Sequence, residues 1–255
     1  MTSALARPHP QLIVAHRGAR QHAPENTMRA FEEAYKCGAD MIECDLRMLG
    51  DGTLVIMHDG FVGRKLLRTL TYEELKASCL PAAIPPTLEE VLQYCATTGM
   101  LLDLELKEGG YERNVLAVLD QYLPRSQVLI TSFKDAVIAT VTTLDPSWHT
   151  GLLLDMPRTR SPRQPSRSLL ERRIACGAEY LVLQRSLYRL RPTFIRQLEV
   201  DKVPFLVWTV NHKRSLARLF GDRKVHGIIT DRPDVARIIR DRLESRKELQ
   251  GKELA

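Results

Sequence analysis

Two histidines in this sequence have surroundings suited to acid–base chemistry. His16 lies in the run AHRGAR and His58 in VIMHDG, and each comes where an apolar run meets a glycine-containing segment. Imidazole is the side chain best matched to proton transfer near neutral pH. One histidine could activate an attacking oxygen while the other protonates a departing alkoxide, as hydrolysis of a phosphate diester requires. We therefore predict His16 and His58 as a catalytic pair.

Acidic residues share one face of each of two predicted strands. In MIECDLRM (41–48), strand alternation places Glu43 and Asp45 together, opposite the apolar side chains. In LLDLELK (101–107), the same rule groups Asp103, Glu105 and Lys107 opposite three leucines. Carboxylates that converge from neighbouring strands repel one another unless cations or protons compensate them.

A hard divalent cation is the simplest compensation for this negative charge. Oxygen ligands at this density suit Mg²⁺ or Ca²⁺ rather than zinc, because no cluster of Cys and His accompanies them. We predict Glu43, Asp45 and Glu105 as the metal ligands. The alternative is that these acids only pair with Arg47, Lys107 or other bases in a polar layer of the fold.

The elements that must position these residues alternate regularly along the chain. Short apolar runs rich in β-branched residues are separated by amphipathic segments, which indicates βα units around a parallel sheet. The runs lie at residues 12–16, 41–48, 101–107, 128–133, 150–155, 180–184, 204–210 and 225–231. Eight such units predict a (β/α)₈ TIM barrel with its active site at the strand ends. A doubly wound open sheet is the rival fold, but no GxGxxG motif follows the first strand.

The regular alternation is interrupted after the second strand. There, GDGTLVIMHDG adds a turn and a further strand before a helix start and a Pro-rich connector. We interpret residues from about 50 to 86 as an insertion on the barrel. The whole chain, 1–255, is then a single domain with a core at about 11–240, and 241–255 is predicted as a helical tail.

Composition and charge exclude several classes of protein. A chain with 44% hydrophobic and 27% charged residues can bury a large core. Without a secretory leader pattern or a run of roughly 18 apolar residues, we expect a cytoplasmic protein. The formal charge of +6 suits an anionic substrate, an anionic membrane surface or nucleic acid. Because no zinc finger, RRM signature or basic zipper is present, we do not expect nucleic acid as a partner.

Seven short motifs follow one another along the chain. They are HRG (16–18), ENT and AF (25–31), ExD (43–45), HD (58–59), ExK (105–107), WTVN (208–211) and GIITDRP (227–233). In this order they resemble the motif series of the glycerophosphodiester phosphodiesterase family, in its bacterial cytosolic form. Each motif alone is weak evidence, but the ordered set covers roughly residues 12–235.

The resemblance implies a (β/α)₈ barrel with a small insertion after the second strand. It also implies metal-dependent hydrolysis of glycerophosphodiesters to glycerol 3-phosphate and an alcohol. The family's acid and base match His16 and His58, and its divalent-metal ligands match the three acids named above. Attack by the adjacent glycerol hydroxyl, through a cyclic phosphate, is the route that the family suggests, with direct attack by water as the alternative.

The same resemblance extends to substrate contacts. Arg17 and Lys107 match residues that contact the phosphate, for which guanidinium and ammonium groups are suited. Glu25 matches a residue of the pocket wall. Trp208 and Phe133, near strand ends, could form an apolar or cation-binding wall, with a place in the core as the alternative. Where the family often has Asn, this chain has Asp103, so the preferred metal is left open.

One segment raises the question of which diester is the substrate. MPRTRSPRQPSRS (156–168) carries four arginines and no acid, and a loop after the fifth strand would lie on the catalytic face. It fits both a solvated loop and a basic lip that attracts anionic head groups or an anionic membrane surface. Besides the glycerophosphodiesterase that we predict, a lysophospholipase D at a membrane surface and a non-enzymatic anion-binding or nucleic-acid-binding protein remain as alternatives. The oligomeric state is left open.

Overall fold

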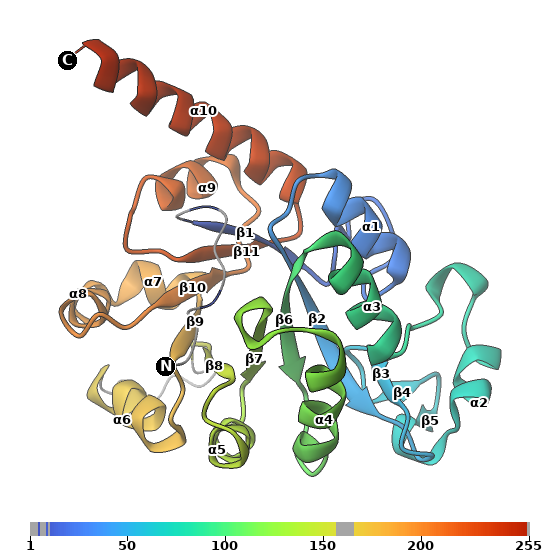
Figure 1. Ribbon diagram of the computed structural model, residues 1–255. Helices are drawn as coiled ribbons and strands as arrows, with labels where there is room; N and C mark the ends of the chain where they lie inside the picture. Colours follow the sequence, from blue (N-terminus) through green and yellow to red (C-terminus); the bar gives the residue numbers. More distant parts are fainter. Residues whose placement is uncertain (1–4, 6–8, 10, 157–165, 254–255) are drawn as a thin grey trace.

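The computed structural model describes residues 5, 9, 11–156 and 166–253, and the side chains of 169–246 in the second long stretch. Parallel strands form a closed barrel at its centre (Figure 1). They are β1 (Leu12–His16), β2 (Met41–Met48), β6 (Leu101–Leu106), β7 (Val128–Ser132), β8 (His149–Leu154), β9 (Tyr180–Gln184), β10 (Phe205–Trp208) and β11 (Gly227–Thr230). β1 pairs in parallel with both β2 and β11, which closes the barrel. The predicted (β/α)₈ barrel is confirmed.

Helices follow the barrel strands and surround them (Figure 1). They are α1 (Met28–Lys36), α3 (Leu88–Thr98), α4 (Glu112–Tyr122), α5 (Asp135–Leu144), α6 (Ser166–Cys176), α7 (Arg185–Leu190), α8 (Pro192–Val200), α9 (Lys213–Phe220) and α10 (Pro233–Glu253), with a 3₁₀ turn at Arg125–Gln127. None of the helices within the described stretches is both long and apolar enough to cross a membrane.

The insertion lies between β2 and α3. It contains β3 (Leu54–Ile56), a small hairpin of β4 (Phe61–Val62) and β5 (Lys65–Leu66), α2 (Tyr72–Ala77), and 3₁₀ turns at Leu67–Thr69 and Pro81–Ala83. β3 runs antiparallel to the end of β2, with Leu46 opposite Ile56. The Met57 amide also donates to the Asp45 carbonyl at 2.7 Å. This pairing returns the chain to the mouth of the barrel, so that His58 follows directly.

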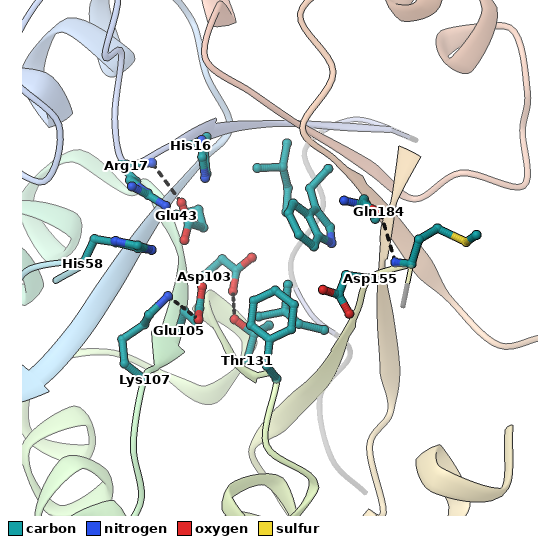
Figure 2. A pocket seen from close by; sticks show the side chains of 15 residues that line it. His16, Arg17, Glu43, His58, Asp103, Glu105, Lys107, Thr131, Asp155 and Gln184 are labelled. Carbon is teal, nitrogen blue, oxygen red and sulfur yellow. Dashed lines mark hydrogen bonds and ion pairs between the residues drawn. The ribbon is translucent and has the colours of Figure 1, made fainter. Parts of the chain in front are cut away.

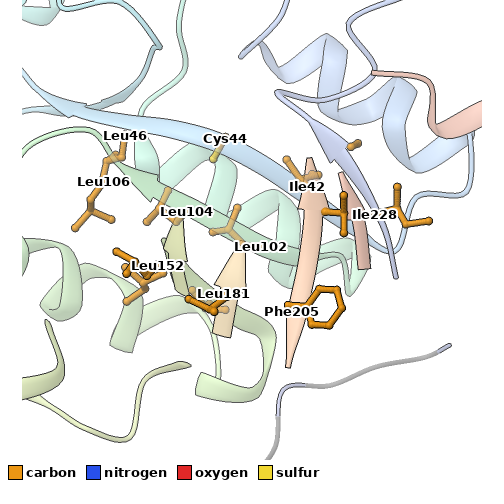
Figure 3. Close-up of a cluster of buried hydrophobic side chains, with 14 of the residues drawn as sticks. Ile42, Cys44, Leu46, Leu102, Leu104, Leu106, Leu152, Leu181, Phe205 and Ile228 are labelled. Atoms are coloured by element: carbon orange, nitrogen blue, oxygen red, sulfur yellow. The ribbon is translucent and has the colours of Figure 1, made fainter. Parts of the chain in front are cut away.

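The two faces of the barrel strands pack against different neighbours. Outward-facing side chains such as Ile42, Leu104 and Leu181 form one large core with the helices (Figure 3). Inward-facing residues such as Leu12 and Met41 form a second apolar cluster inside the barrel. On β1, β2 and β6 the inward positions nearer the strand ends are polar. The interior therefore changes from apolar at the start of the strands to charged at their ends.

Two features of the loops and chain ends bear on the sequence predictions. The sequence predicts a loop over 156–168, but α6 already begins at Ser166. Residues 157–165, with Arg158, Arg160 and Arg163, lie outside the described residues, so the basic lip stays a prediction. The last helix continues through the predicted tail to Glu253.

The turn after β1 depends on glycine. Gly18 has φ +80°, and a Cβ there would lie 2.7 Å from both the carbonyl carbon and the Cβ of Ala30 in α1. Gly52 has a similar φ of +88°, but nothing lies within 4 Å of its Cβ position. Comparison of Gly18 with Gly52 therefore separates the cost of a left-handed backbone from the cost of a clash between a Cβ and α1.

We predict that Gly18→Ala lowers the free energy of unfolding by roughly 2 kcal/mol more than Gly52→Ala does. Both variants share the left-handed backbone, which costs a side-chain-bearing residue about 1–2 kcal/mol. Only Gly18→Ala must also push α1 away from β1. Urea unfolding followed by circular dichroism measures both values, and equal losses would contradict the close packing at Gly18.

Candidate active site

A cavity of about 330 Å³ opens at the carboxyl ends of the barrel strands (Figure 2). Its wall is formed by His16, Arg17, Glu43, His58, Asp103, Glu105, Lys107, Thr131, Phe133, Leu153, Asp155, Met156, Gln184, Trp208 and Ile229. Every barrel strand, or the segment that follows it, contributes to this wall, and β3 supplies the approach to His58. Segments far apart in the sequence therefore meet at one polar pocket.

The acidic residues of β2 and β6 lie inside the barrel and close to one another. Parallel pairing sets Glu43 opposite Asp103 and Asp45 opposite Glu105. Carboxylate oxygens of Glu43, Asp45 and Glu105 lie within 4.8 Å of one another, and all three side chains are buried. The strand parity read from the sequence is confirmed. This arrangement could hold a metal ion.

Two cations enter this cluster from the rim. Lys107 Nζ lies 2.7 Å from Glu105 Oε1 and 3.1 Å from Asp45 Oδ1. Arg17 Nε lies 3.1 Å from Asp45 Oδ2, and its guanidinium also donates to Glu25 at 2.7 Å. Both side chains thus hold a positive charge at the edge of the cavity.

An unusual backbone turn presents Arg17 to the acids. Arg17 has φ +55°, in the left-handed region that side-chain-bearing residues rarely occupy. In this conformation its amide donates to Glu43 Oε2 at 2.8 Å. Asn26 also has φ +55°, and its amide side chain donates to Asp45 at 2.8 Å. Such strained positions persist where the surrounding structure fixes them, commonly at functional sites.

Burial and mutual repulsion raise the pKa values of three of these carboxyl groups. The pKa of Glu43 is raised well above its usual range by burial and by the charges of the neighbouring acids. Burial and the Asp45 charge raise the pKa of Glu105. Burial raises the pKa of Asp103 to about 7, although the Thr131 hydroxyl donates to it at 2.7 Å. Added positive charge would offset these shifts.

Asp45 is the exception among the acids. Burial opposes its ionisation as well, but Lys107 and Arg17 hold its pKa below the usual value. The side-chain amide of Asn26 acts in the same direction. Asp45 is therefore the carboxylate that stays ionised and anchors both cations.

The charge balance shows what the cluster would accept. Four acidic side chains face two basic ones, Arg17 and Lys107. In addition, Asp45 Oδ1 is buried and, apart from its ion pair with Lys107, has no partner within the described part of the chain. Two further positive charges would balance the fully ionised set. The residues present therefore fit a divalent cation.

His16 is held by a chain of hydrogen bonds across the closure of the barrel. Its Nδ1 lies 2.7 Å from Asp231 Oδ1, just after β11. Asp231 in turn accepts from the Asn211 amide at 2.5 Å and donates its own backbone N–H to Asn211 Oδ1. Burial acts to raise the pKa of Asp231, but the bond to His16 and the other contacts lower it overall. If Asp231 accepts the Nδ1 proton, Nε2 is left available to the cavity.

His58 is held more loosely at the other side of Arg17 and Glu43 (Figure 2). Its Nδ1 lies 2.8 Å from Asp59, and its side chain is 38% exposed. The backbone is better fixed, because the His58 carbonyl accepts from Arg47 Nε at 2.8 Å. The two histidines therefore reach the same cavity from separate elements, with the acids between them.

Part of the cavity wall is aromatic. Phe133 and Trp208 form an edge-to-face pair with ring centroids 5.5 Å apart, and both line the cavity. Trp208 Nε1 donates to the Val182 carbonyl at 3.0 Å, so its ring faces the cavity while its N–H is engaged. Asp155 and Gln184 complete this wall.

The structure brings together nearly all the residues singled out from the sequence. Two of the predicted residues do not line the cavity. Glu25, predicted in the wall, contacts Arg17 and Arg20, and Asp45, predicted as a metal ligand, contacts Arg17 and Lys107. Sequence reasoning assigns no role to Asp231, Asn211 or Asn26, although all three lie within the motifs. The remaining wall residues lack any local signal beyond their place late in a strand.

Comparison with known proteins agrees with this geometry. A sequence profile of the glycerophosphoryl diester phosphodiesterase family matches residues 16–235. The chain belongs to this family. It is 30% identical over 244 residues to a glycerophosphodiester phosphodiesterase of Caldanaerobacter subterraneus subsp. tengcongensis, covering 88% of this chain and 95% of the relative. A Bacillus altitudinis protein of the same name is 29% identical, with 91% and 99% covered. The chain is accordingly a phosphodiesterase.

Solved structures of the family share its fold. A glycerophosphodiester phosphodiesterase from Thermotoga maritima superposes with a TM-score of 0.75 at 23% identity, covering 90% of this chain and 98% of that one. A phosphodiesterase from Oleispira antarctica, solved in complex with the product sn-glycerol-3-phosphate, superposes with a TM-score of 0.78 at 25% identity, covering 90% and 96%. The barrel of this chain therefore has the same fold as these solved family members.

For this phosphodiesterase we predict that the free energy of unfolding of the Asp103→Asn variant rises relative to that of the wild type as pH rises. A carboxyl whose pKa is raised from 3.8 to about 7 stabilises the fold fully below pH 4 and loses that contribution as pH rises through 7. The neutral amide avoids this loss and can still accept from Thr131. The difference in unfolding free energy between variant and wild type should grow by up to about 4 kcal/mol between pH 4 and pH 8.

Urea unfolding in the presence of a chelator would measure this difference. Asp51→Asn is the matched control, because hydrogen bonds from the backbone of Thr53 and other groups lower the pKa of this exposed carboxyl. The control should show no gain at high pH. A difference for Asp103→Asn that stays constant with pH would contradict the raised pKa.

Proposed function

We propose that this enzyme hydrolyses glycerophosphodiesters to glycerol 3-phosphate and an alcohol, with a divalent metal and two histidines. One observation carries the proposal: three buried carboxylates lie within 4.8 Å of one another, and two of them, Glu43 and Glu105, line the same cavity as His16 and His58. Family membership supports the substrate class, and the names of the curated relatives agree with it. The product bound to the Oleispira antarctica relative supports the same products here.

Glu43, Asp45 and Glu105 would hold the metal. Their oxygen donors suit a hard cation, Mg²⁺ or Ca²⁺. When bound, the metal would supply Lewis-acid stabilisation of charge on the phosphate. Lys107 and Arg17 stand at the rim of the same cluster and would bind the remaining phosphate oxygens. Both cations contact Asp45, one of the carboxylates that would hold the metal, so they would stand beside the substrate phosphate.

The two histidines would carry the protons. One removes a proton from the attacking oxygen and the other delivers a proton to the departing alcohol oxygen. Asp231 holds the His16 ring in one orientation and favours the tautomer with Nε2 free. Asp59 does the same for His58 at a more exposed position.

The aromatic pair would contact the organic part of the substrate. Phe133, just after β7, and Trp208, at the end of β10, both line the cavity. Their rings would shield that part of the cavity from water and pack against the carbon atoms of the alcohol. They take no part in the proton transfers.

We predict that His16→Ala and His58→Ala each lower kcat at least about 100-fold, because each removes a proton donor or acceptor used in the reaction. Metal affinity should change little, since neither side chain is a proposed ligand. Release of glycerol 3-phosphate from glycerophosphodiesters measures turnover, and calorimetry measures metal binding. His212→Ala, at an exposed position before α9, is the control and should retain wild-type activity.

Near-wild-type turnover by either His16→Ala or His58→Ala would overturn its catalytic role. Loss of turnover together with loss of metal binding would instead indicate that the imidazole supports the metal site.

We predict further that a chelator abolishes activity and that Mg²⁺ or Ca²⁺ restores it. Glu105→Gln should raise the metal concentration needed for half-maximal activity at least about tenfold, because it removes one charged ligand. Glu32→Gln, on the exposed face of α1, is the matched control for loss of one carboxylate. Separate titrations with the two metals decide between them. Full activity in excess chelator would refute the metal role.

A further inference from the structure

A second pocket adjoins the catalytic cavity at the ends of β9 and β10. Its volume is about 320 Å³, within the range of small-molecule sites. It is lined by Gln184, Arg185, Ser186, Arg189, Trp208 and Thr209. Gln184 and Trp208 also line the catalytic cavity, so these two side chains form the boundary between the two spaces. A substrate bound in the cavity could extend past them.

The polar groups of this pocket are arranged mainly as hydrogen-bond donors. Gln184 Oε1 accepts from the Met156 amide at 3.0 Å and from the Ser186 hydroxyl at 2.6 Å. These two contacts fix the amide group and leave its NH₂ as the part available to a ligand. Trp208 contributes only its ring, because its N–H is bonded to Val182. The boundary residue therefore offers N–H donors to whatever enters.

Two arginines add positive charge to this pocket, although Arg189 also lines a neighbouring pocket that contains Glu199 and Asp222. Arg185 and Arg189 are exposed, lie one helical turn apart on α7 and both line the pocket. Neither forms an ion pair with a carboxylate anywhere in the described stretches, and no acidic residue lines the pocket. Arg17 and Lys107, in contrast, are bound to acids. Guanidinium groups in this state are suited to bind a phosphate, often through two parallel hydrogen bonds.

The sequence that follows β9 is rich in basic residues. Residues 185–224 contain ten Lys and Arg against three acids, a formal charge of +7, whereas the whole chain carries +6. Lys213 and Arg214, at the start of α9, follow the carboxyl end of β10, as the pocket does, whereas Lys202 and Lys224 precede β10 and β11 at the other end of the barrel. Only the first of these groups adds to the positive potential on the side of the pocket.

The position of the pocket fits the far end of a substrate. In the barrel order β1-β11-β10-β9-β8-β7-β6-β2, β9 lies diametrically across from β2, which carries Glu43 and Asp45. A diester whose scissile phosphate lies at the acids of β2 and β6 must direct one of its two arms across the mouth. That arm runs toward Gln184.

From these observations we infer that the pocket beyond Gln184 binds a second phosphate group carried by the alcohol arm of the glycerophosphodiester. This inference rests on the proposed function and narrows it to one substrate class. Arg185 and Arg189 bind the second phosphate, and Gln184 donates to it. They determine specificity and take no part in the proton transfers at the scissile bond.

One feature of the catalytic cavity favours the opposite charge. Asp155 lines the cavity together with Phe133 and Trp208, and an acid beside aromatic rings suits an ammonium group such as choline or ethanolamine. Asp155 does not line the second pocket. Experiments can therefore distinguish a long alcohol arm that reaches Arg185 and Arg189 from a short cationic arm that stops at Asp155.

The test compares two diesters that differ in this group. Glycerophosphoglycerol has an uncharged alcohol, whereas 1,3-bis(glycerophospho)glycerol carries a second phosphodiester on the same alcohol. Wild-type enzyme should show a kcat/KM at least about tenfold higher for the second compound, mainly through a lower KM. In the double variant R185Q/R189Q this preference should fall at least about fivefold, and added salt should reduce it in the wild type.

The double variant R29Q/R113Q is the control for loss of two positive charges. Arg29 on α1 and Arg113 on α4 are exposed and line none of the described pockets. This control should keep the wild-type preference. An equal loss in both double variants would show that the preference reflects overall charge and would overturn the pocket assignment.

The remaining outcomes separate this inference from the proposed function. Turnover of both diesters without preference, or a preference for glycerophosphocholine, would overturn the second-phosphate site and leave the phosphodiesterase intact. If neither diester is turned over, the proposed substrate class fails. In that case, calorimetry in the presence of a chelator still tests whether the pocket binds the second phosphate. A Kd for 1,3-bis(glycerophospho)glycerol at least about fivefold lower than that for glycerophosphoglycerol, with the difference lost in R185Q/R189Q, supports the assignment. Equal Kd values for the two compounds refute it.

Discussion

Negative charge buried inside the barrel is the constraint on which the rest of the site depends. Four carboxylates on two adjacent strands are almost completely buried: Glu43, Asp45, Asp103 and Glu105. Carboxylates in that position raise one another's pKa values and destabilise the fold when ionised without partners. The left-handed turn at Arg17, the ammonium group of Lys107 and the amide of Asn26 all bring positive charge or donors to this cluster. Residues that are far apart in the sequence therefore compensate the same buried negative charge.

The same requirement explains how the barrel interior is divided. Near the start of the strands the interior is filled by Leu12, Met41 and their neighbours, which stabilise the fold by burying apolar surface. At the other end of the same strands the inward positions are given to His16, Glu43 and Glu105. One barrel thus combines a part that is stable by itself with a part that is stable only when its charges are compensated. Because the same strands pass through both parts, the apolar interior at their start holds the charged interior at their end in place.

Strand alternation is sufficient to predict most of this from sequence. Because inward positions recur every second residue, the grouping of two acids on β2 and of two on β6 follows from local pattern alone. The adjacency of β2 and β6 follows from the barrel. The contact of His16 with Asp231 is not predictable in this way, because residues 215 positions apart meet only when β1 pairs with β11 and closes the barrel. The placement of His58 likewise depends on the antiparallel pairing of β3 with β2, which no periodicity indicates.

The two sides of the barrel mouth differ in charge, and this difference favours one orientation of a bound substrate. At β2 and β6 the buried acids outnumber the cations, so this side suits a metal ion. Across the mouth, at β9, two arginines line a pocket that contains no acid, and the aromatic pair of Phe133 and Trp208 also lines the mouth. A ligand with both a phosphate and an organic arm has one favourable orientation in such a field, since its reversal would place the apolar arm against the acids. The far side is formed by the ends of β9 and β10 together with α7, whereas the acids lie within β2 and β6. Reaction chemistry and substrate choice are therefore set by different parts of the same mouth.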